Sequence, residues 1–284
     1  MTVIENLRPS TSSRPSGEGK RATAPKRLSR RHLTMWQIVT VLATLLVWTL
    51  IYISGAFSRE LLPPVWEVAV RFVTLITESE FWFALGFTVS NALIGLLLAI
   101  IVGIPLGMVL GTSPALNRST QFLVDLGRAF PVIALLPVMV LILGATAQME
   151  IVVVFLGVVW PILLQTIDGA KRVEPVIADT VSAYRIPLRL RFIKVTLPNA
   201  APFAVTGIRI ASSASILIAL GVEVLSVTPG IGGEISRAQT DGAPALALSY
   251  VIYAGIVGFL VNKVLWSVEG KLLAWNRQSV EAAA

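Results

Sequence analysis

The sequence predicts an all-α integral membrane protein that crosses the bilayer six times. Hydrophobic residues make up 55% of the chain and charged residues only 14%, whereas soluble domains contain about 25% charged residues. The mean hydropathy is +0.79. Several uncharged stretches reach the ~20 residues that a helix needs to span the hydrocarbon core. The segments between them are too short for a soluble domain.

Residues 1–32 form a basic tail that we expect to be disordered and cytoplasmic. Residues 1–31 contain eight Lys and Arg against two Glu, and positive segments are retained on the cytoplasmic side of membranes. A nucleic-acid-binding arm and a transit peptide are the alternatives. No apolar run precedes Met35, so a secretory signal peptide is excluded.

Residues 33–80 hold the first span and an outside amphipathic segment. The span covers residues 35–54 and leaves the cytoplasm, because the basic tail lies inside. A helix is expected to start with the sequence Leu-Leu-Pro-Pro at residues 61–64, since proline is tolerated in a first turn. Apolar residues that place this helix along the membrane surface are Trp66, Val70, Phe72 and Leu75.

Residues 81–270 form the main transmembrane domain, and residues 271–284 a short cytoplasmic tail. The five remaining spans are expected at 81–111, 130–148, 151–167, 199–225 and 246–265. This order places both termini in the cytoplasm. Membrane lipid therefore surrounds the chain, and no feature besides the tail suggests a nucleic-acid partner.

Glycines at every fourth position mark a helix-packing face in the second span. Gly103, Gly107 and Gly111 form a smooth stripe that lets another helix approach closely. A helix of the same chain is favoured over a second chain as the neighbour. In the third span Pro131 and Pro137 are expected to kink the helix and free backbone carbonyls.

Residues 168–198 form the only long charged segment between spans in the second half. Residues 168–202 carry six Lys and Arg against three Asp and Glu, which predicts a cytoplasmic location. Pro187 disfavours helix at the preceding residue, so two helices should meet at a corner made by Tyr184 and Arg185. Leu197 and Pro198 are expected to end the second helix and start the next span.

An exposed aromatic residue and an Arg at such a corner are residue types enriched at protein interfaces. The segment is therefore a candidate docking site for a cytoplasmic partner. The alternative is a corner that is solvated or rests on lipid headgroups.

The sequence offers no catalytic residues and no metal site. It contains no Cys and a single His, His32. Phosphate-loop, zinc-protease and nucleophile-elbow motifs are absent, so no nucleotide or other cofactor is expected on this chain. Any work against a gradient must then be supplied by a partner. An ion-coupled secondary transporter is the alternative, with Glu223 as its coupling group, and a membrane-embedded enzyme comes third.

Arg209 lies inside the fifth span and is a candidate pathway residue, together with Glu223. A central Arg costs roughly 2.5–3.5 kcal/mol, while each Leu, Ile, Val or Phe contributes roughly 0.3–0.6 kcal/mol in favour of insertion. Eleven such residues between 203 and 225 offset that cost. Arg binds oxyanions through its planar fork. A structural role for Arg209, paired with Asp125 or with backbone carbonyls, is the alternative.

The segment from Asp179 to Pro198 resembles the EAA loop of permease subunits in binding-protein-dependent ABC importers. Asp179, Thr180 and Val181 stand at the Glu-Ala-Ala positions, and Leu197 and Pro198 at the Leu-Pro positions. Arg185 replaces the usual glycine, which predicts a corner without left-handed backbone geometry. The resemblance extends over residues 61–270 and favours the nitrate, sulfonate, taurine and bicarbonate branch.

The resemblance implies a six-span type I ABC importer transmembrane domain in a bacterial cell membrane. It implies that Asp179, Thr180, Val181, Tyr184, Arg185, Pro187, Leu197 and Pro198 serve as the ATPase-coupling loop. Two ATPase subunits would bind ATP and Mg²⁺, an external binding protein would deliver the substrate, and a second permease copy would complete a homodimer. The substrate would be a small anion or organosulfonate, with a thiamine-precursor pyrimidine also open.

Overall fold

A computed structural model describes residues 30–59, 61–173 and 175–272, which are mostly helical. The chain divides into two compact units, residues 1–47 and 48–284. The described part of the first unit belongs to helix α1 (Arg30–Ile53), which is long and apolar enough to cross a membrane. The expected tails lie almost entirely outside the described residues.

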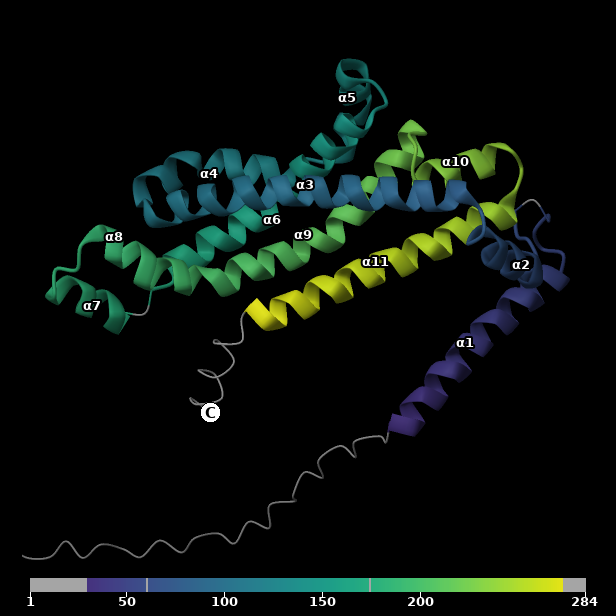
Figure 1. The fold of residues 1–284 in the computed structure, drawn as a ribbon, viewed down its shortest axis with the longest axis horizontal. Helices are drawn as coiled ribbons and strands as arrows, with labels where there is room; N and C mark the ends of the chain where they lie inside the picture. Colours follow the sequence, from purple (N-terminus) through teal and green to yellow (C-terminus); the bar gives the residue numbers. More distant parts are fainter. Residues whose placement is uncertain (1–29, 60, 174, 273–284) are drawn as a thin grey trace, which may run out of the picture. The chain divides into compact units, whose positions relative to one another are not determined.

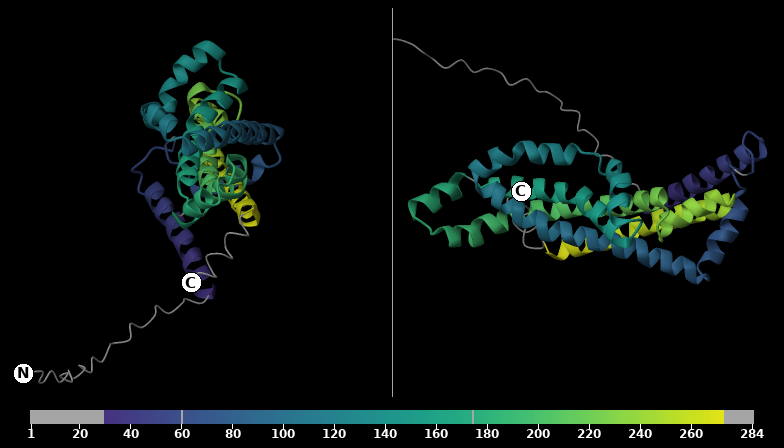
Figure 2. Two further views of the ribbon diagram at one scale, coloured as in Figure 1. Left: turned by 90° about the vertical axis from the view of Figure 1, so that its left-hand side faces the viewer. Right: turned by 90° about the horizontal axis from the view of Figure 1, so that it is seen from above.

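Four long helices form the framework of the second unit and run lengthwise beside one another (Figures 1 and 2). They are α3 (Ser79–Thr112), α6 (Ala147–Lys171), α9 (Leu197–Ser226) and α11 (Pro244–Leu272). Among the described residues five helices, α1 included, are long and apolar enough to span a membrane, or six if one bent pair counts as a span. The expectation of six spans agrees with the higher figure.

Helix α3 packs on α6 through its small residues. A Cβ atom added at Gly107 would lie 2.6 Å from Cβ of Thr166 and 2.9 Å from the Leu163 carbonyl oxygen. Gly103 and Gly111 approach α6 in the same way, and so does Gly95, which lies earlier in α3. The glycine stripe therefore faces a helix of its own chain, and it brings the two backbones into close contact.

The third span differs from the continuous span expected over residues 130–148. Helix α4 (Pro114–Ala129) begins directly after α3, and a 3₁₀ turn (Val132–Leu135) leads into α5 (Leu136–Leu143). Helix α4 and the segment Val132–Leu143 meet at a bend of 81°, and Figure 1 shows α5 turned away from α4. Phe130 is extended, with ψ 126°, because the following Pro131 disfavours a helical conformation there.

Helix α2 (Val65–Leu75) packs against α11 at the end of the unit that also holds α10 (Ile231–Thr240). The rings of Phe72 and Tyr253 stack with centroids 4.2 Å apart, and the Tyr253 hydroxyl donates to the Phe72 carbonyl at 2.8 Å. Leu75 is fully buried, whereas Trp66 is 58% exposed. Phe72 and Leu75, two of the four apolar residues expected to lie along the membrane surface, thus pack within the chain instead.

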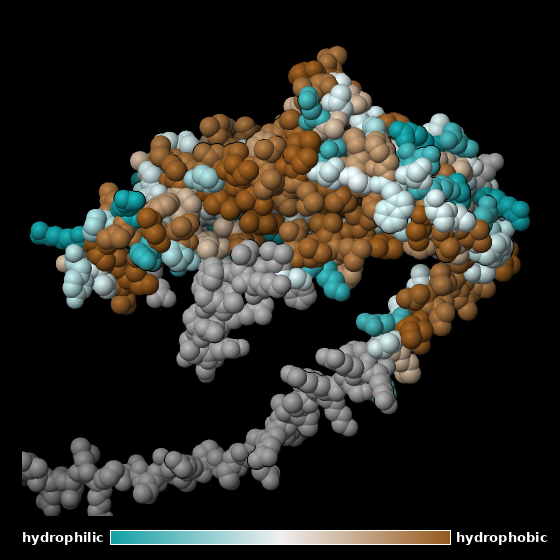
Figure 3. Space-filling view, in the orientation of Figure 1, coloured by the Kyte–Doolittle hydropathy of each residue, from teal (hydrophilic) through white to brown (hydrophobic). Residues whose placement is uncertain are grey.

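The face of the second unit seen in Figure 3 is mostly apolar along its middle, over α3 and its neighbours. Hydrophilic side chains gather around α10, and they are mixed with hydrophobic ones around α7 (Pro175–Ala183) and α8 (Leu188–Arg191). This distribution is the one expected of helices that cross a bilayer, whose polar ends lie at the two interfaces.

Candidate functional site

The segment between α6 and α9 extends beyond the helical framework as two short helices (Figure 1). These are α7 (Pro175–Ala183) and α8 (Leu188–Arg191). Two backbone hydrogen bonds close the corner between them: the Arg185 amide donates to the Ser182 carbonyl at 3.2 Å, and the Ile186 amide to the Val181 carbonyl at 3.1 Å. This pair of bonds is the Schellman motif, which satisfies the last carbonyls of a helix.

Arg185 occupies the position of the motif that requires a left-handed backbone. Its φ is +47°, so the expectation of a corner without left-handed geometry was wrong. Glycine usually fills this position because it has no Cβ to clash. Here the paired amides and the fixed backbone of Pro187 hold an arginine in the same conformation, at a cost of about 1–2 kcal/mol.

Leu197 and Pro198 do not end the second helix, contrary to expectation. A π-helical turn (Phe192–Thr196) joins α8 directly to α9, and the Leu197 amide donates to the Phe192 carbonyl. Proline lacks an amide and is accommodated in the first turn of α9. Helix α8, the π turn and α9 therefore form one continuous helical rod that begins at Leu188, directly after the corner.

The start of α9 is attached to the end of α6. The Asn199 side-chain amide donates to the carbonyls of Gly169, at 3.2 Å, and Arg172. The Arg172 guanidinium lies 5.3 Å from the centre of the Phe203 ring. These contacts hold the base of the segment, while α7 and α8 project from it.

Several apolar side chains on this projecting segment are exposed although the segment belongs to a polar end of the molecule. Tyr184 and Leu188 are each 79% exposed, and Val176 is 74% exposed. Asp179 and Thr180 are also exposed, whereas Val181 is buried under the corner. Exposed aromatic and aliphatic groups beside charged ones are the surface that a protein partner covers.

The two candidate pathway residues lie in different surroundings. Arg209 is exposed on α9, whereas Glu223 near the end of the same helix is fully buried. Glu223 Oε2 accepts hydrogen bonds from Thr88 Oγ1 at 3.0 Å and from the Gly232 amide at 2.7 Å. Glu223 thus ties the first turn of α10 to α3 and α9.

A second buried carboxyl group, Glu150 on α6, was missed by the sequence analysis. The Asn91 side-chain amide donates to Glu150 Oε2 at 3.1 Å, and Glu150 is fully buried. The one signal available in the sequence is the pair Thr88 and Asn91, two polar residues three positions apart in an uncharged span. Their partners are 135 and 59 residues away, which no local pattern reveals.

The chain matches a known family of transport proteins. The family described as "Binding-protein-dependent transport system inner membrane component" matches residues 103–268. The taurine transport system permease protein TauC of Escherichia coli (strain K12) is 26% identical over 254 residues, which cover 87% of this chain and 91% of that protein.

Two further relatives also match this chain over most of their length. The formylaminopyrimidine transport permease protein ThiX of Halalkalibacterium halodurans is 30% identical over 221 residues, covering 77% of this chain and 87% of that protein. The bicarbonate transport system permease protein CmpB of Synechocystis sp. is 29% identical over 239 residues, covering 80% of this chain and 84% of that protein.

The fold also matches a solved structure. A chain of the MetNI methionine ABC transporter, in an inward-facing conformation, superposes with a TM-score of 0.53 at 17% identity and covers 67% of this chain and 98% of that chain. The chain therefore belongs to the family of binding-protein-dependent transport system inner membrane components, and it is a multi-pass permease of an ABC importer rather than an enzyme.

Proposed function

We propose that this permease forms the translocation pathway for a small anion and is driven by ATPase subunits that dock on residues 168–198. Family membership implies an ATPase and a binding protein as partners. The proposed docking site is supported by the projecting α7–α8 corner, where the apolar side chains of Tyr184 and Leu188 are each 79% exposed.

The geometry of the corner suits the transmission of movement. ATP-driven closure of the ATPase subunits must displace the spans, and this requires a stiff contact between the two proteins. The helical rod that begins at Leu188 and continues through the π turn into α9 provides such a contact. A displacement of the corner is then transmitted into α9 without an intervening flexible loop.

The assembly we propose contains two copies of this permease, two ATPase subunits and one extracytoplasmic binding protein. The α7–α8 corner and both chain termini lie in the cytoplasm, because positive segments remain on that side. ATP and Mg²⁺ are held by the ATPase subunits, with no cofactor on this chain.

A small anion is the proposed substrate. Relatives are named for the transport of taurine, nitrate, bicarbonate and aliphatic sulfonates, all of which carry an oxyanion group. Arg209 is the residue of α9 that we place beside the pathway, because an ionisable group within a span normally faces the bundle interior or a wet cavity.

The docking surface is tested by co-purification of the ATPase with variants of this chain. Tyr184→Ala and Leu188→Ala together are expected to abolish co-purification while the permease remains in the membrane. Phe259→Ala, which removes a 64% exposed aromatic group from α11, is the matched control and should retain the ATPase. Normal co-purification of the double variant would refute docking at this corner.

A further inference from the structure

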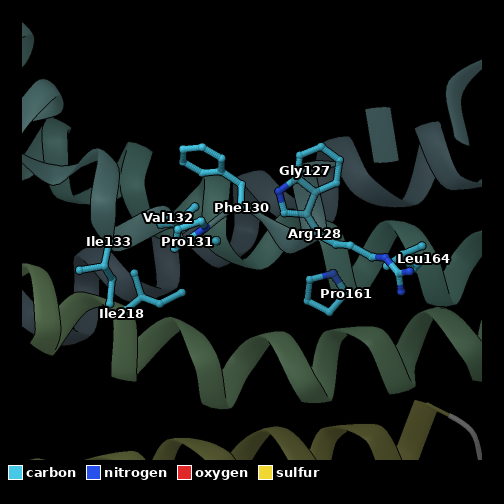
Figure 4. A pocket seen from close by; sticks show the side chains of 11 residues that line it. Gly127, Arg128, Phe130, Pro131, Val132, Ile133, Pro161, Leu164 and Ile218 are labelled. Atoms are coloured by element: carbon cyan, nitrogen blue, oxygen red, sulfur yellow. The ribbon is translucent and has the colours of Figure 1, made fainter. Parts of the chain in front are cut away.

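A cavity of about 440 Å³ lies where the third span is broken. The end of α4, the extended residues after it, and the facing side of α6 line this cavity, and Figure 4 shows Arg128 and Phe130 at its α4 side with Pro161 and Leu164 on α6. Ligand sites for small molecules are mostly apolar concavities of ~300–1,000 Å³ with a few polar groups. The cavity has this size and composition.

The cavity extends along α6 from the middle of this helix towards its Lys171 end. Its lining residues Gly157 and Trp160 are ten and thirteen residues from the start of α6 at Ala147. That distance is about 15–20 Å along a helix about 37 Å long. Leu164, at the other end of the cavity, lies seven residues before the end of α6 at Lys171.

The backbone at residues 130–131 is non-helical at the same depth, and Phe130 and Pro131 are exposed on the surface of the chain. Irregular backbone at membrane depth is tolerated where it is buried in protein or lines a water-filled cavity. Phe130 and Pro131 line the cavity, so the broken span corresponds to the second of these cases.

Arg128 supplies the charged group of this cavity. Its Nε atom lies 3.0 Å from Oδ1 of Asp125, one helical turn earlier. The side-chain atom of Arg128 that the ion pair uses is Nε, and the Nη1–Nη2 edge of a guanidinium is the one that binds an oxyanion through two parallel bonds.

Aromatic and apolar groups complete the cavity. The Trp160 ring lies directly on Gly127, where an added Cβ atom would be 2.2 Å from the indole. Glycine at position 127 thus leaves room for the indole, which forms one wall of the cavity. Val132 and Ile218 form an apolar wall beside Gly157, which suits the short carbon chain of an organic anion.

We infer that this cavity is a binding site for a small organic oxyanion, held by the Nη1–Nη2 edge of Arg128 with its carbon chain against Trp160. The inference rests on the proposed function and names the place in this chain where the transported anion is bound. It adds a selective site in the permease itself to the selection made by the binding protein.

Thiol labelling tests the site directly because the chain contains no cysteine. Leu164→Cys, introduced into the permease–ATPase complex in lipid nanodiscs, places one thiol in this chain beside Arg128. Sulfonatoethyl methanethiosulfonate and trimethylammonioethyl methanethiosulfonate each form a mixed disulfide with the thiolate and release methanesulfinate. The complex with the cysteine-free permease gives the background from the ATPase.

The anionic reagent should label the thiol at position 164 at least about tenfold faster than the cationic reagent. Each labelling rate is first divided by the rate of the same reagent with a free small thiol. Ethanesulfonate should slow the labelling of the Leu164→Cys parent, because it occupies the same site. Adding Arg128→Gln should bring the rates of the two reagents close together and should remove this protection by ethanesulfonate. Arg128→Lys should retain the preference for the anionic reagent but lose protection by ethanesulfonate, because Lys binds as a point charge.

Arg118→Gln is the matched control, since Arg118 is an exposed arginine on the same helix outside the cavity. It should leave both rates unchanged. Equal rates in the Leu164→Cys parent, or a preference that survives Arg128→Gln, would overturn the inference. ATP-driven uptake of taurine and nitrate by the wild-type complex is measured separately: its absence would count against the proposed function, and the labelling result would stand.

Discussion

Replacing Arg185 with Gly should stabilise the corner between α7 and α8. Arg185 has a φ of +47°, and a left-handed backbone costs an L-residue about 1–2 kcal/mol. Glycine removes that cost but loses about 0.5–1 kcal/mol through the greater freedom of the unfolded segment. The middle of the two ranges gives a net gain of about 0.75 kcal/mol, which lowers the population of the open corner about two- to fivefold.

Hydrogen–deuterium exchange in nanodiscs, without the ATPase, measures this effect at the amides that close the corner. The amides of Tyr184, Arg185 and Ile186 should exchange about two- to fivefold more slowly in Arg185→Gly than in the wild type. Arg185→Ala keeps the left-handed cost and should show no such slowing. Arg185→Val should exchange faster, because a β-branched residue is poorly tolerated in this conformation. Equal exchange in the Gly and Ala variants would refute the role assigned to backbone strain.

Three further predictions concern the helical framework and the pathway. Gly107→Val should lower the free energy of unfolding by about 1–3 kcal/mol, read as a lower Tm in detergent, because its Cβ meets Thr166 at 2.6 Å. Gly86→Ala, inside the same helix with open space around it, should keep or slightly raise the Tm, since Ala is the better helix former; an equal loss in the two variants would contradict the close packing. Glu223→Ala should lower the Tm more than Glu234→Ala, because it leaves the buried Gly232 amide without its acceptor, at about 1–3 kcal/mol; equal shifts would argue against the anchor. Arg209→Gln should reduce anion uptake in proteoliposomes while the ATPase still co-purifies, and unchanged uptake would remove Arg209 from the pathway.

Long apolar stretches predicted α3 and α11 because a single helix accounts for each of them. Proline was harder to interpret, since its effect depends on the surrounding helix. Pro131 breaks the third span by forcing Phe130 into an extended conformation, whereas Pro198 sits in the first turn of α9, where its missing amide costs little. The local sequence is similar in character at both places, and the packing around it decides the outcome.

The corner and the buried carboxyl groups show two other limits of prediction. The absence of glycine at position 185 argued against left-handed geometry, but the paired amides of Arg185 and Ile186 impose it. Glu150 and Glu223 become neighbours of Asn91 and Thr88 only when α3, α6 and α9 pack together. The sequence indicated where polar groups occur in the spans, while their partners follow from tertiary structure.

The glycine contacts between α3 and α6 determine which parts of the permease are able to move. At Gly107 and Gly111 the α3 backbone lies so close to α6 that an added Cβ would be 2.9 and 2.8 Å from a carbonyl oxygen of α6. No flexible side chain at these points allows sliding by a change of rotamer, so α3 and α6 move as one rigid body. The broken backbone at residues 130–131 has no regular helix to hold it, so we expect relative motion during a transport cycle at this junction rather than between α3 and α6.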